Sequence, residues 1–140
     1  MAFVITQLPN RPILWVAVEV PVEDYLSSYR MVNHQLTQII TQADKSFHIW
    51  IDASELNLSF SDVILGTQAM AQHKPEAFRS PLARWAVIGT HPLIEIAIRR
   101  MDRDLGLHMK QFVSLEDALT KFDNDLSHAV PSLALPPVNR

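Results

Sequence analysis

The sequence predicts an α/β domain with a mixed, mostly parallel sheet of about five strands and about four helices. The chain has 140 residues, which is a common size for a single domain. Its hydrophobic content of 48%, with three Trp and six Phe, is sufficient to fill one core. Segments typical of strands and helices follow one another in the order β-β-α-β-α-β-α-β-α. Such alternation favours parallel strand pairs covered by helices.

The first two elements are predicted to form a β-hairpin. Residues 3–6 and 13–20 are rich in β-forming side chains, and the segment between them contains two prolines that would interrupt a helix. Along the second strand Leu14, Val16 and Val18 share one face, and the opposite face is also largely apolar. We therefore expect this strand to lie inside the sheet.

The middle of the chain changes between helical and strand periods. From residue 21 to about residue 44, apolar side chains recur at steps of three and four, which is typical of an amphipathic helix. Residues 47–51 then have the composition of a strand, and residues 52–60 are expected to form a loop. Ser59 and Asp62 have the spacing of a capping box, so they predict a second helix that ends near residue 74.

The last third of the chain predicts two further strand and helix pairs. Residues 84–89 indicate a short buried strand, His91-Pro92 a helix start and Gly106 the end of that helix. Residues 109–113 indicate a final strand, and an amphipathic helix follows as far as Leu126. We therefore expect a domain over residues 1–127 and a proline-containing tail over residues 128–140.

Composition excludes several classes of function. The chain has no cysteine, so disulfides, thiolate metal sites and nucleophilic cysteine chemistry are absent. The net charge is −3 and there is no run of like charge, which argues against a nucleic-acid or anionic membrane surface. No segment has the roughly 18 consecutive apolar residues of a membrane span, and the first residues do not resemble a signal peptide. We expect a cytoplasmic protein without membrane insertion.

The histidines do not form a metal motif. None of the six has a partner at ligand spacing on one predicted element, so we expect neither a metal nor another cofactor. His48 lies in an apolar strand, where we expect it to make a hydrogen bond at the sheet.

Two further groups allow a functional and a structural interpretation. Thr90 and His91 follow a predicted strand and precede a helix, a position where α/β proteins bind anions, but either residue could simply cap that helix. Arg99, Arg100 and Arg103 could meet an acidic partner or phosphate. Their acidic neighbours favour a solvated helix face with intrahelical ion pairs.

The stretch at the start of the second helix is the remaining candidate. A serine at a helix amino terminus is a good cap and, when exposed, a good phosphorylation site, because the helix dipole favours an added anion. Capping is the simpler role for Ser59, which places Ser61 in the first turn beside Asp62.

The order of elements and several local patterns resemble the STAS domain, the module of anti-sigma-factor antagonists related to sporulation protein SpoIIAA. The resemblance covers roughly residues 3–127. It is carried by the opening hairpin, the apolar strand ending in Ile51-Asp52, the stretch Ser61-Asp62-Val63-Ile64-Leu65-Gly66, the strand Trp85-Ala86-Val87-Ile88-Gly89 and the junction Val113-Ser114-Leu115-Glu116-Asp117-Ala118-Leu119.

The resemblance implies a regulatory rather than a catalytic domain. In regulatory STAS domains a partner kinase phosphorylates a serine at the start of the second helix, and counting from Asp52 this serine corresponds to Ser61. The family has an Asp-Ser pair with a glycine close behind, whereas here Phe60 precedes the serine and Asp62 follows it.

We therefore expect a non-enzymatic module that binds a protein partner near Asp52, Ser59, Ser61 and Asp62. A small-molecule or lipid-binding module of the related Sec14-like fold is the alternative. An enzyme would need a pocket that joins His91 to a distant acid such as Asp52. A homodimer is also expected, because the hairpin edge and the apolar residues of the tail offer surface for a symmetric contact.

Overall fold

The computed structural model describes residues 3–18, 25–42, 45–57, 59–73 and 80–134. This part of the chain is an α/β domain whose elements follow the predicted order. Its strands are β1 (Phe3–Gln7), β2 (Ile13–Val18), β3 (Phe47–Asp52), β4 (Ala83–Ile88) and β5 (Lys110–Phe112). Its helices are α1 (Tyr25–Thr41), α2 (Phe60–His73), α4 (Leu93–Leu105) and α5 (Leu115–Ala134).

The five strands form one mixed sheet in the order β1-β2-β3-β4-β5. β1 and β2 are antiparallel, as the predicted hairpin requires, and the pairs from β2 to β5 are parallel. The register places His48 of β3 between Ile13 of β2 and Arg84 of β4. Because side chains alternate along a strand, these three residues share one face of the sheet.

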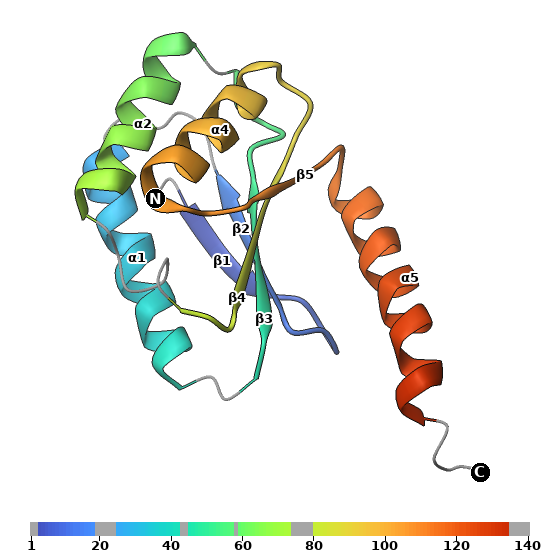
Figure 1. Ribbon diagram of the computed structural model, residues 1–140. Coiled ribbons are helices and arrows are strands. Elements are labelled where there is room, and N and C mark those ends of the chain that lie inside the picture. The colour runs from blue at the N-terminus through green and yellow to red at the C-terminus, as the bar shows by residue number, and fades with distance from the viewer. Residues whose placement is uncertain (1–2, 19–24, 43–44, 58, 74–79, 135–140) are drawn as a thin grey trace.

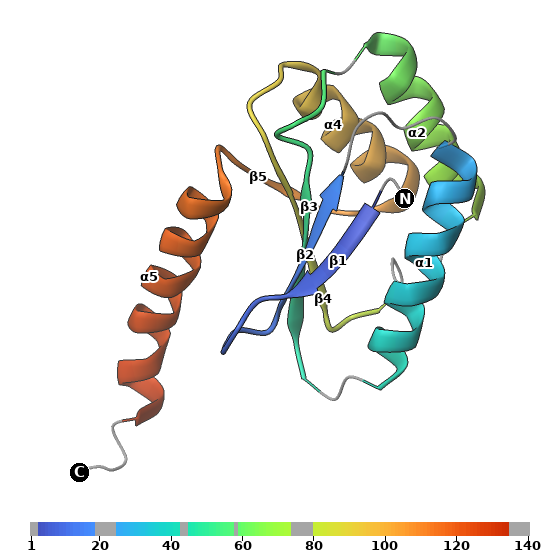
Figure 2. The same cartoon turned by 180° about the vertical axis from the view of Figure 1, so that it is seen from behind.

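Helices cover the two faces of the sheet unequally. α1, α2 and α4 lie together on one side, and α5 lies alone on the other (Figure 1). The view from behind shows the same arrangement, with α5 running away from the end of β5 toward the opposite end of the sheet (Figure 2). In the described part of the chain, three helices therefore cover one face and a single helix covers the other.

Each face has its own hydrophobic core. Leu14, Val16 and Val18 point into the larger core under the three helices, together with the fully buried Ile49. Ile13 and Trp50 point toward α5, whose Ala118 is also fully buried. The two apolar faces predicted for β2 are thus both used, which confirms its interior position in the sheet.

The helix α5 is longer than the sequence predicts. It continues to Ala134, through part of the segment that we expected to be a tail. Pro131 suggests an end to the helical pattern, because an interior proline removes one backbone hydrogen bond and crowds the carbonyl four residues earlier, but a helix can continue past a proline with a bend. The remaining tail residues, 135–140, lie outside the described part of the chain.

Candidate functional site

The start of α2 has the reciprocal cap that the sequence predicts. The backbone N–H of Asp62 donates to Ser59 Oγ at 3.1 Å, and the backbone N–H of Ser59 donates to Asp62 Oδ2 at 2.9 Å. These bonds satisfy donors that the first helical turn would otherwise leave unpaired, which is the purpose of a capping box. The structural role of Ser59 is confirmed, and the carboxylate of Asp62 is held by the cap.

The residues beside this cap are apolar and exposed. Phe60 is 60% exposed and Leu65 is 58% exposed, although both are large hydrophobic side chains on a regular helix. Ser61 is also exposed and lies one helical turn before Leu65, so these two share a face. We call Phe60, Ser61 and Leu65 the α2-start surface. The sequence contains the signal for this surface, since Phe60 directly follows the cap and lies outside the inward stripe of α2.

Asp52 is separate from the α2-start surface. Its Oδ2 accepts a hydrogen bond from Trp15 Nε1 at 2.9 Å, and its Oδ1 accepts from the backbone N–H of Ser54 at 3.0 Å and from the Ser54 hydroxyl. Both carboxylate oxygens are therefore used at the end of β3. Among the described residues no hydrogen bond or ion pair joins Asp52 to Ser59, Ser61 or Asp62. The structure assigns Asp52 to the loop and sheet rather than to the start of α2.

His91 caps α4. Its Nδ1 accepts a hydrogen bond from the backbone N–H of Leu93 at 3.2 Å, and its carbonyl accepts from the N–H of Ile94 at 3.0 Å. Pro92 already has helical angles, with φ −57° and ψ −29°. The capping interpretation is confirmed for His91, while Thr90 is exposed. At its other end α4 terminates at Gly106, as predicted, with φ +68° and an N–H bond to the carbonyl of Asp102.

The arginines of α4 have different partners. Arg99 pairs with Glu95 one turn earlier, and Arg103 pairs with its neighbour Asp104 at 2.8 Å. These two pairs fit the expected solvated helix face. Arg100 differs, because its Nε donates to Thr67 Oγ1 of α2 at 2.9 Å. The Thr67 side chain is buried, so this bond ties α2 to α4.

An apolar cavity of about 130 Å³ lies between the sheet and the three helices that cover it. Its walls include Ile51 and Ala53 of the β3 end, Val63 of α2 and Met101 of α4. Asp62 and Thr67 are the polar residues in its lining, and neither His91 nor Asp52 lines it. This volume is close to that of an engineered apolar cavity that holds one benzene molecule.

His48 does not make the expected hydrogen bond. The described part of the chain contains no hydrogen-bond partner for its ring, so that prediction is wrong. Instead the half-buried ring packs edge-on against Phe122 of α5, with centroids 5.1 Å apart, and against Trp50 at 6.4 Å. Burial and the positive charges of Arg84 and Lys110 lower the pKa of His48. The His48 ring thus makes apolar contacts next to two positively charged side chains.

The described residues contain neither a metal-binding cluster nor a membrane-spanning helix. No group of three or more His, Asp or Glu side chains in this part of the chain is arranged to hold a metal ion. None of the helices there is both long enough and apolar enough to cross a membrane.

Comparison with known proteins adds no relative. No protein-family model matches the chain, and neither the curated proteins nor the solved structures give a significant match. The interpretation of the site therefore depends on its own geometry.

Proposed function

We propose that this protein is a non-enzymatic interaction module of the STAS-like kind, which binds a protein partner through the α2-start surface. The exposure of Phe60 and Leu65 carries the proposal. Large apolar side chains that stay exposed beside polar groups are typical of protein contacts, where aromatic residues supply much of the binding energy. The cap formed by Ser59 and Asp62 holds this surface on a rigid helix start.

The side chains available for catalysis also support a binding role. The carboxylate of Asp52 accepts three hydrogen bonds, and the Nδ1 of His91 accepts one from its own helix. A general base needs a free lone pair within reach of a substrate proton. The two residues that an enzyme would need here are both used in local structure.

The test is affinity capture with paired variants. Phe60→Ser with Leu65→Ser removes the apolar part of the α2-start surface, and Met31→Ser with Val113→Ser removes two other exposed hydrophobic side chains as a control. We expect proteins captured from a cell extract by the unmodified chain to be lost with the first pair and retained with the second. Equal capture by both pairs would contradict the proposal. Exposed substitutions of this kind change stability by roughly 0.5 kcal/mol or less, so folding should be unaffected.

Phosphorylation of Ser61 is a subordinate part of the proposal. The serine is exposed in the first turn of α2, where added negative charge interacts favourably with the helix dipole, although Asp62 beside it opposes that effect. Incubation with cell extract and ATP, followed by mass spectrometry, should detect phosphate on Ser61. Ser61→Asp should then change the capture of the same partner, whereas Ser61→Ala should not. An unmodified Ser61 together with an unchanged capture would exclude this mechanism.

A small-molecule binding module is the second candidate, and the apolar cavity favours it. The cavity has room for one small apolar molecule, and a lipid chain would require the helices to move apart. A native mass spectrum of the purified protein distinguishes the two functions. Retained ligand mass would favour a binding pocket, and the bare chain mass would favour the interaction module.

Self-association through the hairpin edge is also proposed. β1 is at the edge of the sheet, and Val4 on it is 40% exposed. An unpaired edge strand offers backbone donors and acceptors to a second copy. Light scattering should give the mass of a homodimer for the full chain, and a monomeric mass would refute the proposal.

A further inference from the structure

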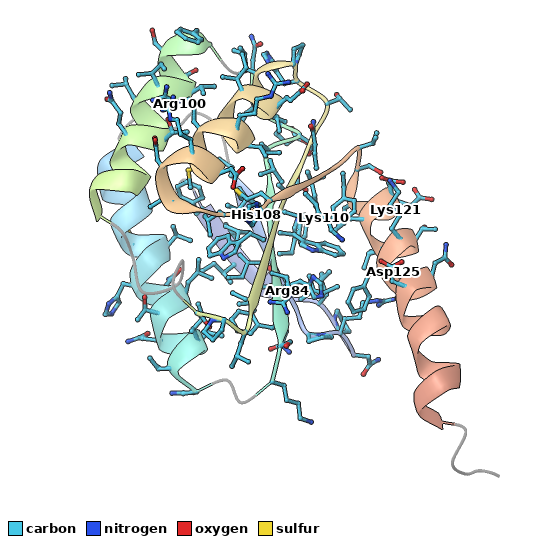
Figure 3. The ribbon with its side chains drawn as sticks, viewed as in Figure 1. Arg84, Arg100, His108, Lys110, Lys121 and Asp125 are labelled. Carbon is cyan, nitrogen blue, oxygen red and sulfur yellow. The ribbon has the colours of Figure 1, made fainter. Side chains whose placement is uncertain are left out.

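A second surface lies between α5 and the amino ends of the parallel strands, on the sheet face opposite to α2. It is a groove of about 650 Å³, a volume within the usual range for small-molecule sites. The sheet contributes His48, Arg84 and Lys110, and α5 contributes Lys121 and Phe122. Figure 3 shows Arg84 and Lys110 on the sheet side and Lys121 and Asp125 on the α5 side. We call this the basic groove.

The charge of the basic groove differs from that of the whole chain. Arg84, Lys110 and Lys121 line it with Asp125 as the acidic residue, whereas the chain as a whole has a net charge of −3. Lys121 is partly neutralised by Asp117, with Nζ 3.3 Å from Oδ2. Arg84 and Lys110 have no carboxylate partner among the described residues. The groove thus concentrates positive charge that the surrounding protein does not balance.

The positive charges converge on one place. The register sets Arg84 of β4 directly opposite His48. Lys110 of β5 lies opposite Ala86, which is the next residue of β4 on the same face as Arg84. Both cations lie close enough to the half-buried His48 ring to disfavour its protonation. A small anion between Arg84 and Lys110 would replace this repulsion by charge-assisted hydrogen bonds, for which both side chains have free donors.

Aromatic rings lie next to these cations. Phe122 packs on His48, and Phe112 lies under Lys121, whose Nζ is 5.7 Å from the ring centroid. Phe112 and Phe122 are half-buried, so part of each ring faces the groove, while Trp50 is fully buried beneath them. Partly exposed rings beside paired cations suit a planar ligand with one strongly charged group.

We propose that the basic groove binds a small aromatic molecule that carries a phosphate group. Arg84 and Lys110 hold the phosphate, and Phe112 and Phe122 contact the ring. The site is on the other face of the sheet from the α2-start surface and does not depend on the function proposed for that surface.

Calorimetric titration with three probes tests the proposal. Phenyl phosphate has both parts of the ligand, inorganic phosphate has only the anion, and phenol has only the ring. At about pH 7.5 the phosphate group is mostly dianionic. We expect phenyl phosphate to bind at least roughly tenfold more tightly than either of the other probes, since each part contributes on the order of one charge-assisted or aromatic contact. Equal binding of phenyl phosphate and inorganic phosphate, or no binding of phenyl phosphate, would overturn the proposal.

Matched variants locate the site. Arg84→Gln with Lys110→Gln should weaken phenyl phosphate binding by roughly tenfold or more, because two charge-assisted contacts are lost. Arg99→Gln with Arg103→Gln makes the same change in net charge on α4, which covers the other face of the sheet, and should leave binding unchanged. Arg84→Lys with Lys110→Arg keeps both charges and should retain most of the affinity. Equal weakening by the two glutamine pairs would show a general charge effect and would overturn the proposal.

Discussion

Arg11 and Asp123 are 112 positions apart in the chain and are joined by two parallel hydrogen bonds. Arg11 Nε donates to Asp123 Oδ1 at 3.1 Å, and Nη2 donates to Oδ2 at 2.8 Å. Arg11 lies in the turn between β1 and β2, and Asp123 lies on α5. This bidentate pair, with a geometry that only arginine provides, therefore fastens α5 to the hairpin at the sheet face that α5 covers.

We expect the loss of this pair to loosen α5 more than the rest of the protein. Arg11→Gln or Asp123→Asn should increase hydrogen exchange at the amides of α5. Arg11→Lys should retain part of the protection, because lysine keeps the positive charge but cannot make the two parallel hydrogen bonds of the guanidinium. Arg99→Gln, which removes the exposed pair with Glu95, is the control and should leave α5 unchanged. An equal increase in hydrogen exchange across the whole protein in the Arg11 variants would contradict the role of this pair in holding α5.

The same pair predicts an effect of acid. The hydrogen bond from Arg11 lowers the pKa of Asp123 below its ordinary value of 3.8. A carboxyl group with a lowered pKa in the folded state stabilises that state above its unfolded pKa, and the stabilisation is lost as the pH falls through the folded pKa. The difference in urea midpoint between the unmodified chain and Asp123→Asn should therefore be constant at neutral pH and shrink below about pH 4.

His48 predicts a second acid effect in a separate range of pH. Its pKa is lowered from 6.5 by burial and by the charges of Arg84 and Lys110. The unfolded chain then binds a proton that the folded chain does not, so stability is complete above pH 6.5 and falls as the pH drops through the lowered pKa. His48→Phe keeps a ring against Phe122 and removes the titration. Its urea midpoint should change less between neutral pH and about pH 5 than that of the unmodified chain.

Two variants serve as controls for this prediction. His34→Asn changes an exposed histidine of α1 and should keep the acid sensitivity of the unmodified chain. Arg84→Gln removes one of the two neighbouring charges, so it should raise the pKa of His48 toward its ordinary value in an NMR titration. A midpoint for His48→Phe that falls as steeply as that of the unmodified chain would contradict the prediction.

The order of elements, the start of α2 and the end of α4 could be predicted because they depend on neighbouring residues. Apolar periodicity indicates the α/β class, Ser59 and Asp62 form the cap that their spacing indicates, and Gly106 ends α4 as its residue type indicates. Contacts across the chain could not be found in this way. The sequence does not show the strand register that sets Arg84 opposite His48, and without that register the basic groove cannot be predicted.

Hydrogen-bond partners that are distant in the sequence explain where Asp52 and Arg100 differ from the sequence-based expectation. Asp52 and Ser61 are near one loop in the sequence, but the indole of Trp15, 37 positions from Asp52, holds the Asp52 carboxylate at the sheet. The arginines of α4 look alike in the sequence, yet the buried Thr67 on α2 gives Arg100 a different role. Both outcomes depend on helix and strand packing, which a one-dimensional pattern does not contain.

Gly89 is expected to be required at the end of β4. Its φ is +148°, and a Cβ built there would lie 2.6 Å from Cδ1 of Ile94, which is fully buried. Gly106 has φ +68°, and a Cβ built on Gly106 would have no atom within 4 Å. Gly106→Ala should therefore cost only backbone strain, roughly 1–2 kcal/mol. Gly89→Ala should cost more, by about 1–3 kcal/mol, because the new methyl group also overpacks the core.

A rescue variant separates strain from overpacking at Gly89. Ile94→Val removes Cδ1, the atom that the new methyl group would meet, and by itself should cost about 0.5–1.5 kcal/mol. Denaturation of Gly89→Ala, Ile94→Val and the double variant forms a cycle. We expect the double variant to be more stable than the sum of the single effects predicts, and strict additivity would show that the contact with Ile94 does not matter.

The hydrogen bond between Arg100 and Thr67 should stabilise the packing of α2 against α4. The Thr67 hydroxyl donates to the carbonyl of Val63 at 2.7 Å and accepts from Arg100 Nε at 2.9 Å. Thr67→Val has nearly the same shape but leaves the guanidinium donor without its acceptor, which should cost about 1–3 kcal/mol. Thr67→Ser keeps the hydroxyl and should lose only about 0.8 kcal/mol for the missing methyl group. Urea denaturation compares the two variants, and equal costs would mean that packing rather than the bond to Arg100 holds the helices together.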